Sequence, residues 1–459
     1  MARNIVILSD GTGQRGGLQF DERRSNIYKL YRATRCGPDS SVDPTRQVAL
    51  YDPGLGTLPG GIDSPAALLR SFYNLASQGT GLGITRNIVD CYADIIGEWR
   101  EGDRIFLFGF SRGAYTVRCL AGVLRLCGVP TRMPDGSPIR RDPASIRALA
   151  AEGVRIYNYT NSRPKADRTP RQEELLNQRR LLANRFREQH RSGDKGGNAR
   201  PYFIGVFDTV ASLANPLAII GLAAVVLAVI ALVSLASLWL PGSYLEWFLA
   251  LGGAVALAGI SWNLISRIKF AFGLPGIPWW RTIHLATARM KMYDTELDPE
   301  VSHARHALAI DEHRASFQRV AWTPPEDCTG KDPQWFEQVW FAGNHSDVGG
   351  SYSENESRLS DIALQWMVDA AAGAGLLHDH TVLRAFADPT GMQHDESKSS
   401  VFRFARKIDR RIPANAPLHP SVLDRFSAKE VLHYDENRAY RPEALRKHGK
   451  VAHFYPPNG

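Results

Sequence analysis

Five short apolar runs, rich in β-branched and aromatic residues, recur along the first three quarters of the chain. Each is bounded by residues that favour turns, and they are NIVILSD (4–10), QVALYD (47–52), RIFLFGF (104–110), YFIGVFD (202–208) and QVWFAG (338–343). Their almost continuous hydrophobicity is typical of parallel strands covered on both faces. Segments with helical periodicity separate several of these runs, at 85–99, 114–128 and 357–375. The alternation predicts an α/β fold with a doubly wound, mostly parallel sheet.

Two longer uncharged stretches, at 217–240 and 247–265, follow the fourth run. They hold 24 and 19 consecutive positions without a charge. Either length is enough for a helix to cross about 30 Å of hydrocarbon. Aromatic residues that favour a membrane interface lie near their ends, namely Trp239, Tyr244, Trp247 and Trp262. The stretches predict an inserted transmembrane helical hairpin, and the alternative is a pair of helices buried in a large core.

The charges around this hairpin predict its orientation. Glu246 is the only charge in the connection, whereas both outer flanks carry Lys and Arg, including Arg267 and Lys269. The positive-inside rule therefore places both flanks in the cytoplasm. The N-terminal sequence MARNIVILSDGTG lacks the apolar core and cleavage site of a signal peptide.

The net charge of +8 is concentrated in one segment. Residues 163–200 hold eleven Lys and Arg against five Asp and Glu. The segment has no RNA-binding signature and no helix-turn-helix pattern, so we expect no nucleic-acid partner. It is either a solvated helix and loop or, beside the hairpin, a contact for anionic lipid headgroups.

We expect neither a metal nor a nucleotide cofactor. The five cysteines are scattered and lack metal-ligand spacing, so they are interpreted as reduced thiols. The Gly-rich stretches at 51–57 and 79–87 lack the Gly-Lys-Ser/Thr of a phosphate-binding loop. Metal-site spacing such as HExxH is also missing around the four Asp and His residues that follow predicted strands, which are Asp10, Asp208, His345 and Asp347.

The stretch GFSRGAYTVR (109–118) places Ser111 in a G-x-S-x-G pattern between the third apolar run and a helical segment. In a nucleophile elbow, small residues at 109 and 113 let the strand and helix approach, and the serine hydroxyl stands clear of the sheet. The next amide, on Arg112, can donate to an oxyanion at the helix N-terminus. The alternative is an ordinary serine flanked by two glycines.

Partners for Ser111 follow in the chain order of α/β-hydrolases, serine, acid and histidine. Asp208 ends the fourth run, and His345 lies in AGNHSDVGGSY after the last run. A serine nucleophile needs a base, and that base needs an orienting carboxylate. Asp208 could instead cap the following segment, and His345 could be a surface histidine. Asp347 is either a rival acid or a residue that shapes the loop.

The turn SDGTGQ (9–14) follows the first predicted strand and carries Asp10. In this fold class a second oxyanion amide comes from a loop after an early strand. Gly11 or Thr12 could donate it. Asp10 and Thr12 could also serve as local hydrogen-bonding groups of the turn, and the two roles are compatible.

Several segments together resemble the DUF2235 family, whose members include the catalytic domains of Tle1-type phospholipase effectors of the bacterial type VI secretion system. They are ILSDGTGQ, YDPGLGT, GTGLGITRNI, GFSRGAYTVR, FIGVFDTVAS, FAGNHSDVGGSY and HPSVLDRF, in that order along the chain. The resemblance implies an α/β-hydrolase fold. It matches Ser111, Asp208 and His345 to the family's serine, acid and histidine, and implies hydrolysis of a lipid or other ester.

Together these features divide the chain into a first part of the hydrolase core (1–212), a transmembrane hairpin (213–270), a second part of the core (271–387) and a C-terminal extension (388–459). We expect a serine hydrolase anchored in a bacterial inner membrane, with its catalytic domain facing the cytoplasm, that cleaves carboxylic esters of phospholipids. One alternative is a catalytically inert hydrolase-fold scaffold or signalling protein in the membrane. The other is a type VI secretion phospholipase effector, which two membrane-spanning stretches suit less well.

Overall fold

The computed structural model describes residues 2–11, 23–54, 82–161, 168–210, 216–286, 295–324, 330–332, 334–398 and 406–456. Thr12 and parts of both Gly-rich stretches, 55–57 and 79–81, lie outside these residues.

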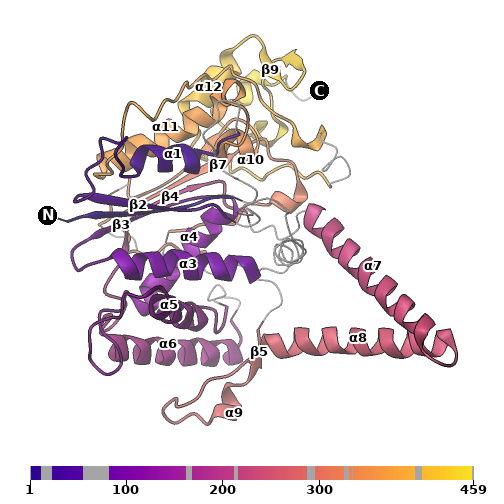
Figure 1. The fold of residues 1–459 in the computed structure, drawn as a ribbon. Coiled ribbons are helices and arrows are strands. Elements are labelled where there is room, and N and C mark those ends of the chain that lie inside the picture. The colour runs from indigo at the N-terminus through magenta and orange to yellow at the C-terminus, as the bar shows by residue number, and fades with distance from the viewer. Residues whose placement is uncertain are drawn as a thin grey trace.

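A six-stranded parallel sheet forms the centre of the described fold, in the order β2-β1-β3-β4-β7-β8 (Figure 1). Its strands are β1 (Asn4–Ser9), β2 (Gln47–Asp52), β3 (Arg104–Phe110), β4 (Pro201–Phe207), β7 (His303–Ala309) and β8 (Phe336–Phe341). Five of them are the five predicted runs. The sixth, β7, has the sequence HARHALA, in which buried Arg305 pairs with Glu337 of β8 at 2.9 Å. Because Arg and His interrupt its apolar residues, this strand does not match the pattern of an apolar run and was not predicted.

Helices cover both faces of the sheet, as predicted for a doubly wound fold. On one face lie α1 (Asn26–Thr34) and α11 (Arg358–Gly373), and on the other α3 (Leu82–Glu98) and α4 (Arg112–Cys127), with α5 (Pro143–Tyr157) and α6 (Pro170–His190) outside them (Figure 1). Each face has its own buried apolar cluster. The predicted apolar face of α3 is fully inside, because Ile88, Tyr92 and Ile95 have no exposed surface.

The C-terminal residues, expected only as an extension, cover the β8 edge of the sheet. This part contains α12 (Pro420–Ser427), β9 (Val431–His433) and β10 (Glu436–Arg438). The backbone of Trp340 accepts from His419 and donates to the Pro417 carbonyl, both at 2.9 Å. Leu418 and Phe426 pack in a third apolar cluster with Trp340. An edge strand that would otherwise present unpaired backbone groups is thereby covered.

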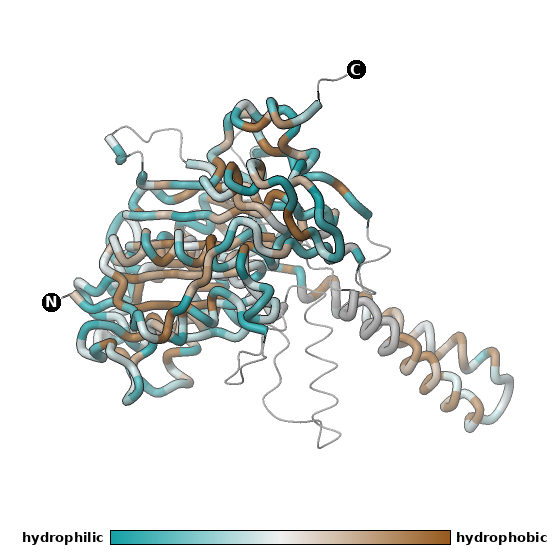
Figure 2. The backbone as a smooth tube through the Cα atoms, turned by 90° about the horizontal axis from the view of Figure 1, so that it is seen from above, coloured by the Kyte–Doolittle hydropathy of each residue, from teal (hydrophilic) through white to brown (hydrophobic). Residues whose placement is uncertain are grey.

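After β4 the chain leaves the sheet as two long helices, α7 (Pro216–Trp239) and α8 (Tyr244–Arg267), which project from the body as a hairpin (Figures 1 and 2). Residues Tyr244–Trp262 are long and apolar enough to cross a membrane by length and composition, and none of that stretch is buried. Trp239 and Trp262 are 84% and 77% exposed. The alternative of a core helix therefore does not hold for α8 in this chain. A short β-hairpin, β5 (Ile268–Lys269) with β6 (His284–Leu285), and α9 (Trp279–Thr282) between them lead back toward the sheet.

Candidate active site

Ser111 lies in a sharp turn between β3 and α4. Its backbone has φ 58° and ψ −116°, a conformation that a residue with a side chain rarely adopts. Glycine is required on both sides. A Cβ on Gly113 would lie 1.9 Å from the Ser9 carbonyl oxygen, and one on Gly109 would lie 2.5 Å from the Gly113 oxygen. Strand and helix therefore approach as a nucleophile elbow requires, and the strained serine is held in place by packing.

The two described candidate oxyanion donors, the backbone amides of Arg112 and Gly11, differ in whether they are free to bind an oxyanion. Arg112 is the first residue of α4, so its amide has no acceptor within the helix. Gly11 lies beside the nucleophile, because a Cβ on it would be 3.3 Å from Ser111 Cβ. Its amide, however, donates to Asp10 Oδ1 at 2.7 Å. The Arg112 amide is therefore the better placed of these two donors, and Thr12 lies outside the described residues.

Asp208 and His345 are paired at the carboxyl edge of the sheet. Asp208 follows β4 with a positive φ of 37°, and His345 begins the short helix α10 (His345–Gly349). His345 Nδ1 donates to Asp208 Oδ2 at 2.6 Å, and both side chains are buried. This bond fixes the tautomer in which Nε2 is the acceptor. Nε2 is buried and has no hydrogen-bond partner among the described residues. Its lone pair is therefore available to accept a proton, as a general base requires.

Contacts of neighbouring residues bring this pair to the elbow. Phe110, which precedes Ser111, stacks on the His345 ring at a centroid distance of 4.6 Å. Phe317 packs edge-on against the same ring at 5.1 Å. The Ser111 amide donates to the Phe207 carbonyl at 3.1 Å, one residue before Asp208. Ser111, Asp208 and His345 thus share one end of the sheet, and His345 is buried there, unlike a surface histidine.

Arg410, from the C-terminal part, binds the carboxylate of Asp208 through two hydrogen bonds. The sequence did not predict this residue. Its Nη2 donates to Asp208 Oδ2 at 2.9 Å and its Nη1 to Oδ1. The carbonyls of Ala309 and Phe317, each 3.0 Å away, fix the same guanidinium. Burial alone would raise the pKa of Asp208, but Arg410 and the His345 bond outweigh it and hold that pKa well below its ordinary value. No motif or spacing around Arg410 distinguishes it from the other arginines of the chain.

Asp347 shapes the histidine loop. Its Oδ2 accepts from the backbone amides of Asn344 and His394 at 3.0 Å, and its Oδ1 pairs with His394 Nδ1 at 2.7 Å. Asn344 in turn caps α10. Because both carboxylate oxygens are engaged away from His345, Asp347 is a loop-shaping residue and the role of rival acid is excluded by geometry.

Asp10 organises the turn after β1. Its carboxyl is buried and bonds to the Ser25 hydroxyl, to Tyr51 OH at 2.9 Å and to the Gly11 amide. Burial raises the pKa of Asp10 to about 7, against the lowering effect of these hydrogen bonds. Asp10 is therefore a supporting residue that fixes the backbone beside Ser111.

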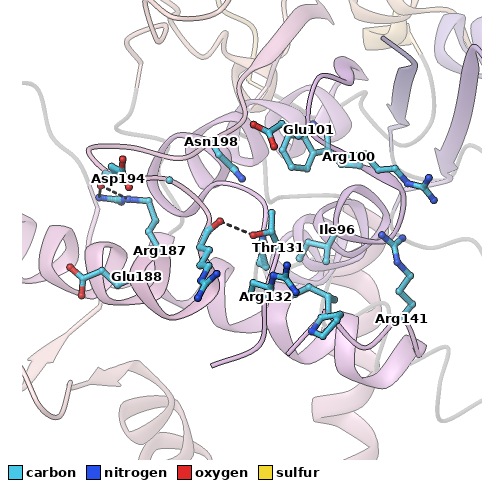
Figure 3. Close-up of a pocket in the computed structure, with 16 residues that line it drawn as sticks. Ile96, Arg100, Glu101, Thr131, Arg132, Arg141, Arg187, Glu188, Asp194 and Asn198 are labelled. Carbon is cyan, nitrogen blue, oxygen red and sulfur yellow. Dashed lines mark hydrogen bonds between the residues drawn. The ribbon is translucent and has the colours of Figure 1, made fainter. Parts of the chain in front are cut away.

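A wide cleft of about 1100 Å³ lies away from these residues. Its lining includes Arg132, Arg141, Arg187 and Glu188 (Figure 3) and combines the ends of α3 and α6 with the segment after α4. Ser111 stands at the start of α4, whose 16 residues rise about 24 Å. The cleft is thus at the opposite edge of the sheet from the candidate triad.

Residues 3–230 and 269–370 match the family described as type VI secretion system (T6SS) phospholipase effector Tle1-like, catalytic domain. The chain belongs to this family. The matched residues include Ser111, Asp208 and His345, whereas Arg410 and most of the α7–α8 hairpin fall outside them. The family match therefore covers the six-stranded core and the first part of α7, whereas the end of α7 and all of α8 lie outside it.

The individual proteins that resemble this chain share low sequence identity with it or match only a short part of it. The protein YEL023C of Saccharomyces cerevisiae is 32% identical over 132 residues, which is 28% of this chain and 18% of that protein. A crystal structure of a Pseudomonas aeruginosa protein aligns with 15% identity and a TM-score of 0.36, over 84% of this chain and 49% of that one. The Tle1 effector bound to the VgrG spike of the type 6 secretion system aligns with 13% identity and a TM-score of 0.32, over 84% and 77%. The chain thus spans less than half the length of the first two relatives.

Proposed function

We propose that the protein is a membrane-anchored serine hydrolase that cleaves carboxylic esters of phospholipids. The observation that carries the proposal is the buried His345, whose Nδ1 is bound to Asp208 and whose Nε2 has no partner among the described residues beside the Ser111 elbow. Membership of a family described by phospholipase effectors supports the substrate class.

In the proposed mechanism, Ser111 Oγ attacks the ester carbonyl while His345 Nε2 takes its proton. Asp208 stabilises the imidazolium that forms, and the Arg112 amide with the α4 N-terminus stabilises the oxyanion. His345 then returns the proton to the alcohol oxygen as the ester C–O bond of the tetrahedral intermediate breaks, and the acyl group stays bonded to Ser111 Oγ as the acyl-enzyme. Water, deprotonated by His345, releases the fatty acid and regenerates Ser111.

The hairpin supports the membrane part of the proposal. Its exposed apolar side chains have no partner surface among the described residues, and a bilayer would cover them. A catalytic domain anchored in this way meets lipid esters at high effective concentration. We place the hairpin in a bacterial inner membrane with the catalytic domain in the cytoplasm, because the turn at its tip has no Lys or Arg whereas the outer flank carries Arg267 and Lys269. A cysteine at Ser243 should react with a membrane-impermeant maleimide added outside intact cells. Labelling only after permeabilisation would contradict this orientation.

Turnover of fluorogenic phospholipids by the purified full-length protein tests the activity. Ser111→Ala should reduce turnover to background while the protein stays folded. Ser346→Ala, a serine of the same site to which we assign no catalytic role, should retain it. Equal turnover by Ser111→Ala and the parent protein would contradict the mechanism.

A secreted effector is the second candidate, favoured by the description of the family. It predicts that the protein is toxic when a signal sequence directs it to the periplasm, and that Ser111→Ala removes the toxicity. A resident inner-membrane enzyme predicts no toxicity that depends on periplasmic targeting.

A further inference from the structure

The segment 267–286, here called the strap, displays a set of exposed apolar side chains at the foot of α8. It comprises β5, α9, β6 and their connections (Figure 1). Seven large apolar residues of this short segment are at least 41% exposed: Ile268, Phe270, Phe272, Trp279, Trp280, Ile283 and Leu285. Such a density of exposed aromatic residues is unusual for a surface in contact with water.

Hydrogen bonds of two inward-facing residues, Thr282 and His284, hold the strap in a defined conformation. Thr282 is fully buried, and its hydroxyl bonds to both the amide and the carbonyl of Ala271. His284 bonds to the carbonyls of Thr282 and Tyr159 at 2.8 and 2.7 Å. The Thr282 bonds fix the fold of the strap itself, and Tyr159 attaches it to the body of the protein, because its carbonyl bonds to His284 and its hydroxyl donates to the Thr282 carbonyl at 3.3 Å.

The charges of the strap are of one sign. Residues 267–286 contain no Asp or Glu and carry Arg267, Lys269 and Arg281. Two arginines of α6 are also bound to the strap's backbone: Arg171 donates to the Arg281 carbonyl at 2.9 Å, and Arg185 to the Phe272 carbonyl at 2.8 Å. The basic segment predicted to meet lipid thus adjoins an exposed aromatic surface.

Aromatic rings beside Lys and Arg, in a strap that itself has no acidic residue, match the headgroup region of an anionic bilayer, although Arg171 of the adjoining α6 is also paired with Glu174 at 2.7 Å. The strap is also continuous with α8, which ends at Arg267 where the strap begins. We propose that the strap lies in the headgroup layer next to the hairpin and holds the catalytic domain against the membrane surface. This inference rests on the membrane anchoring in the proposed function.

The position of the strap can be measured with a fluorophore on single cysteines in the full-length protein, with Cys36 and Cys328 replaced by serine. The protein is reconstituted in vesicles of phosphatidylcholine and phosphatidylglycerol that contain a shallow spin-labelled lipid quencher. A probe at Trp280→Cys should be quenched several-fold more than one at Phe386→Cys, an exposed aromatic position beside α11. A probe at Leu257→Cys on α8, with a deep quencher, reports on the hairpin independently.

The outcomes separate the two proposals. Quenching at 257 without quenching at 280 would overturn the strap and leave the anchored hairpin intact. Quenching at neither position would overturn both. The charge contribution is tested by Arg281→Glu, which should reduce quenching at 280 in phosphatidylglycerol vesicles and have no effect in phosphatidylcholine alone. Unchanged quenching in both would contradict the recognition of anionic headgroups.

Discussion

Arg410 and Asp208 lie 202 positions apart in the chain, yet two side-by-side hydrogen bonds join them at the centre of the candidate site. The pair is buried, with 6% of the Arg410 side chain and none of the Asp208 side chain exposed. Asp208 thus has two side-chain partners, the His345 imidazole and the Arg410 guanidinium, and its Oδ1 also accepts from the Ala309 backbone amide at 3.1 Å. The C-terminal part of the chain therefore completes a site whose other residues come from the family-matched core.

Arg410→Gln should lower kcat/KM by about 10²-fold, because Asp208 loses the group that orients it. Activity should also be lost at a higher pH on the acid side of the profile, since Asp208 loses the guanidinium that holds its pKa well below the ordinary value. Glu312, which is paired with Arg314, and Arg319 remain as the other charges near this pair. Arg411→Gln, at an exposed neighbouring position, is the control. An unshifted profile with lowered activity would indicate a purely structural role.

Arg410→Gln should also reduce the free energy of unfolding by about 3 kcal/mol, because a buried carboxylate loses its ion-pair partner. Chemical denaturation at neutral pH measures this. Arg410→Lys keeps the charge without the bidentate geometry and should lie between Arg410→Gln and the parent protein.

Gly113→Ala should prevent the elbow from forming, because its Cβ would meet the Ser9 carbonyl oxygen at 1.9 Å. Overpacking against backbone that cannot move aside should cost about 3 kcal/mol or more. The matched control is Gly97→Ala in α3, where the new Cβ would lie 3.7 Å from Ile146 Cδ1. Comparable melting temperatures for the two variants would show that the close approach at Gly113 is not required.

Asp10 should make the protein less stable as pH rises. Its pKa is about 7 in the folded protein, against about 3.9 in an unfolded chain. The folded state therefore holds the extra proton between these values, and the stabilisation present below pH ~4 is lost up to pH ~7. Asp10→Asn, which stays neutral, should flatten this part of the curve of unfolding free energy against pH. Parallel curves for the two proteins would contradict the raised pKa.

The two candidate acids can be separated by activity. Asp208→Asn should reduce kcat by about 10⁴-fold, because the histidine loses its orienting carboxylate. Asp347→Asn should act mainly on stability, by about 1–3 kcal/mol, because a buried hydrogen-bonding group of the loop is weakened. Steady-state kinetics and thermal unfolding of both variants measure this difference. A larger kinetic loss for Asp347→Asn would reverse the assignment.

Local signals in the sequence predict the elbow at Ser111 and the chain order of the candidate serine, acid and histidine. Gly109, Ser111 and Gly113 have fixed spacing, and Asp208 and His345 each follow an apolar run that predicts a buried strand. The strand β7 escaped prediction because Arg305 and His306 occupy buried positions, where partners distant in the sequence, including Glu337 and Gln338 of β8, satisfy their polar groups. These polar residues carry no local sign of burial.

Long-range contacts account for the other differences. Arg410 reaches the site only because the C-terminal part packs on the β8 edge, a tertiary contact without a sequence pattern. The role of Asp347 depended on His394, 47 positions away. The amide of Gly11 was available in the sequence, but in the fold it is bound by Asp10.

The central claim is that Ser111 is an activated nucleophile, and a fluorophosphonate probe tests it most directly. The probe should label the full-length protein at Ser111, identified by mass spectrometry of the modified peptide, and Ser111→Ala should abolish labelling. His345→Ala should slow it strongly, because the base is lost. A folded protein that remains unlabelled, or is labelled at a different serine, would contradict the account and favour an inert scaffold built on a hydrolase fold.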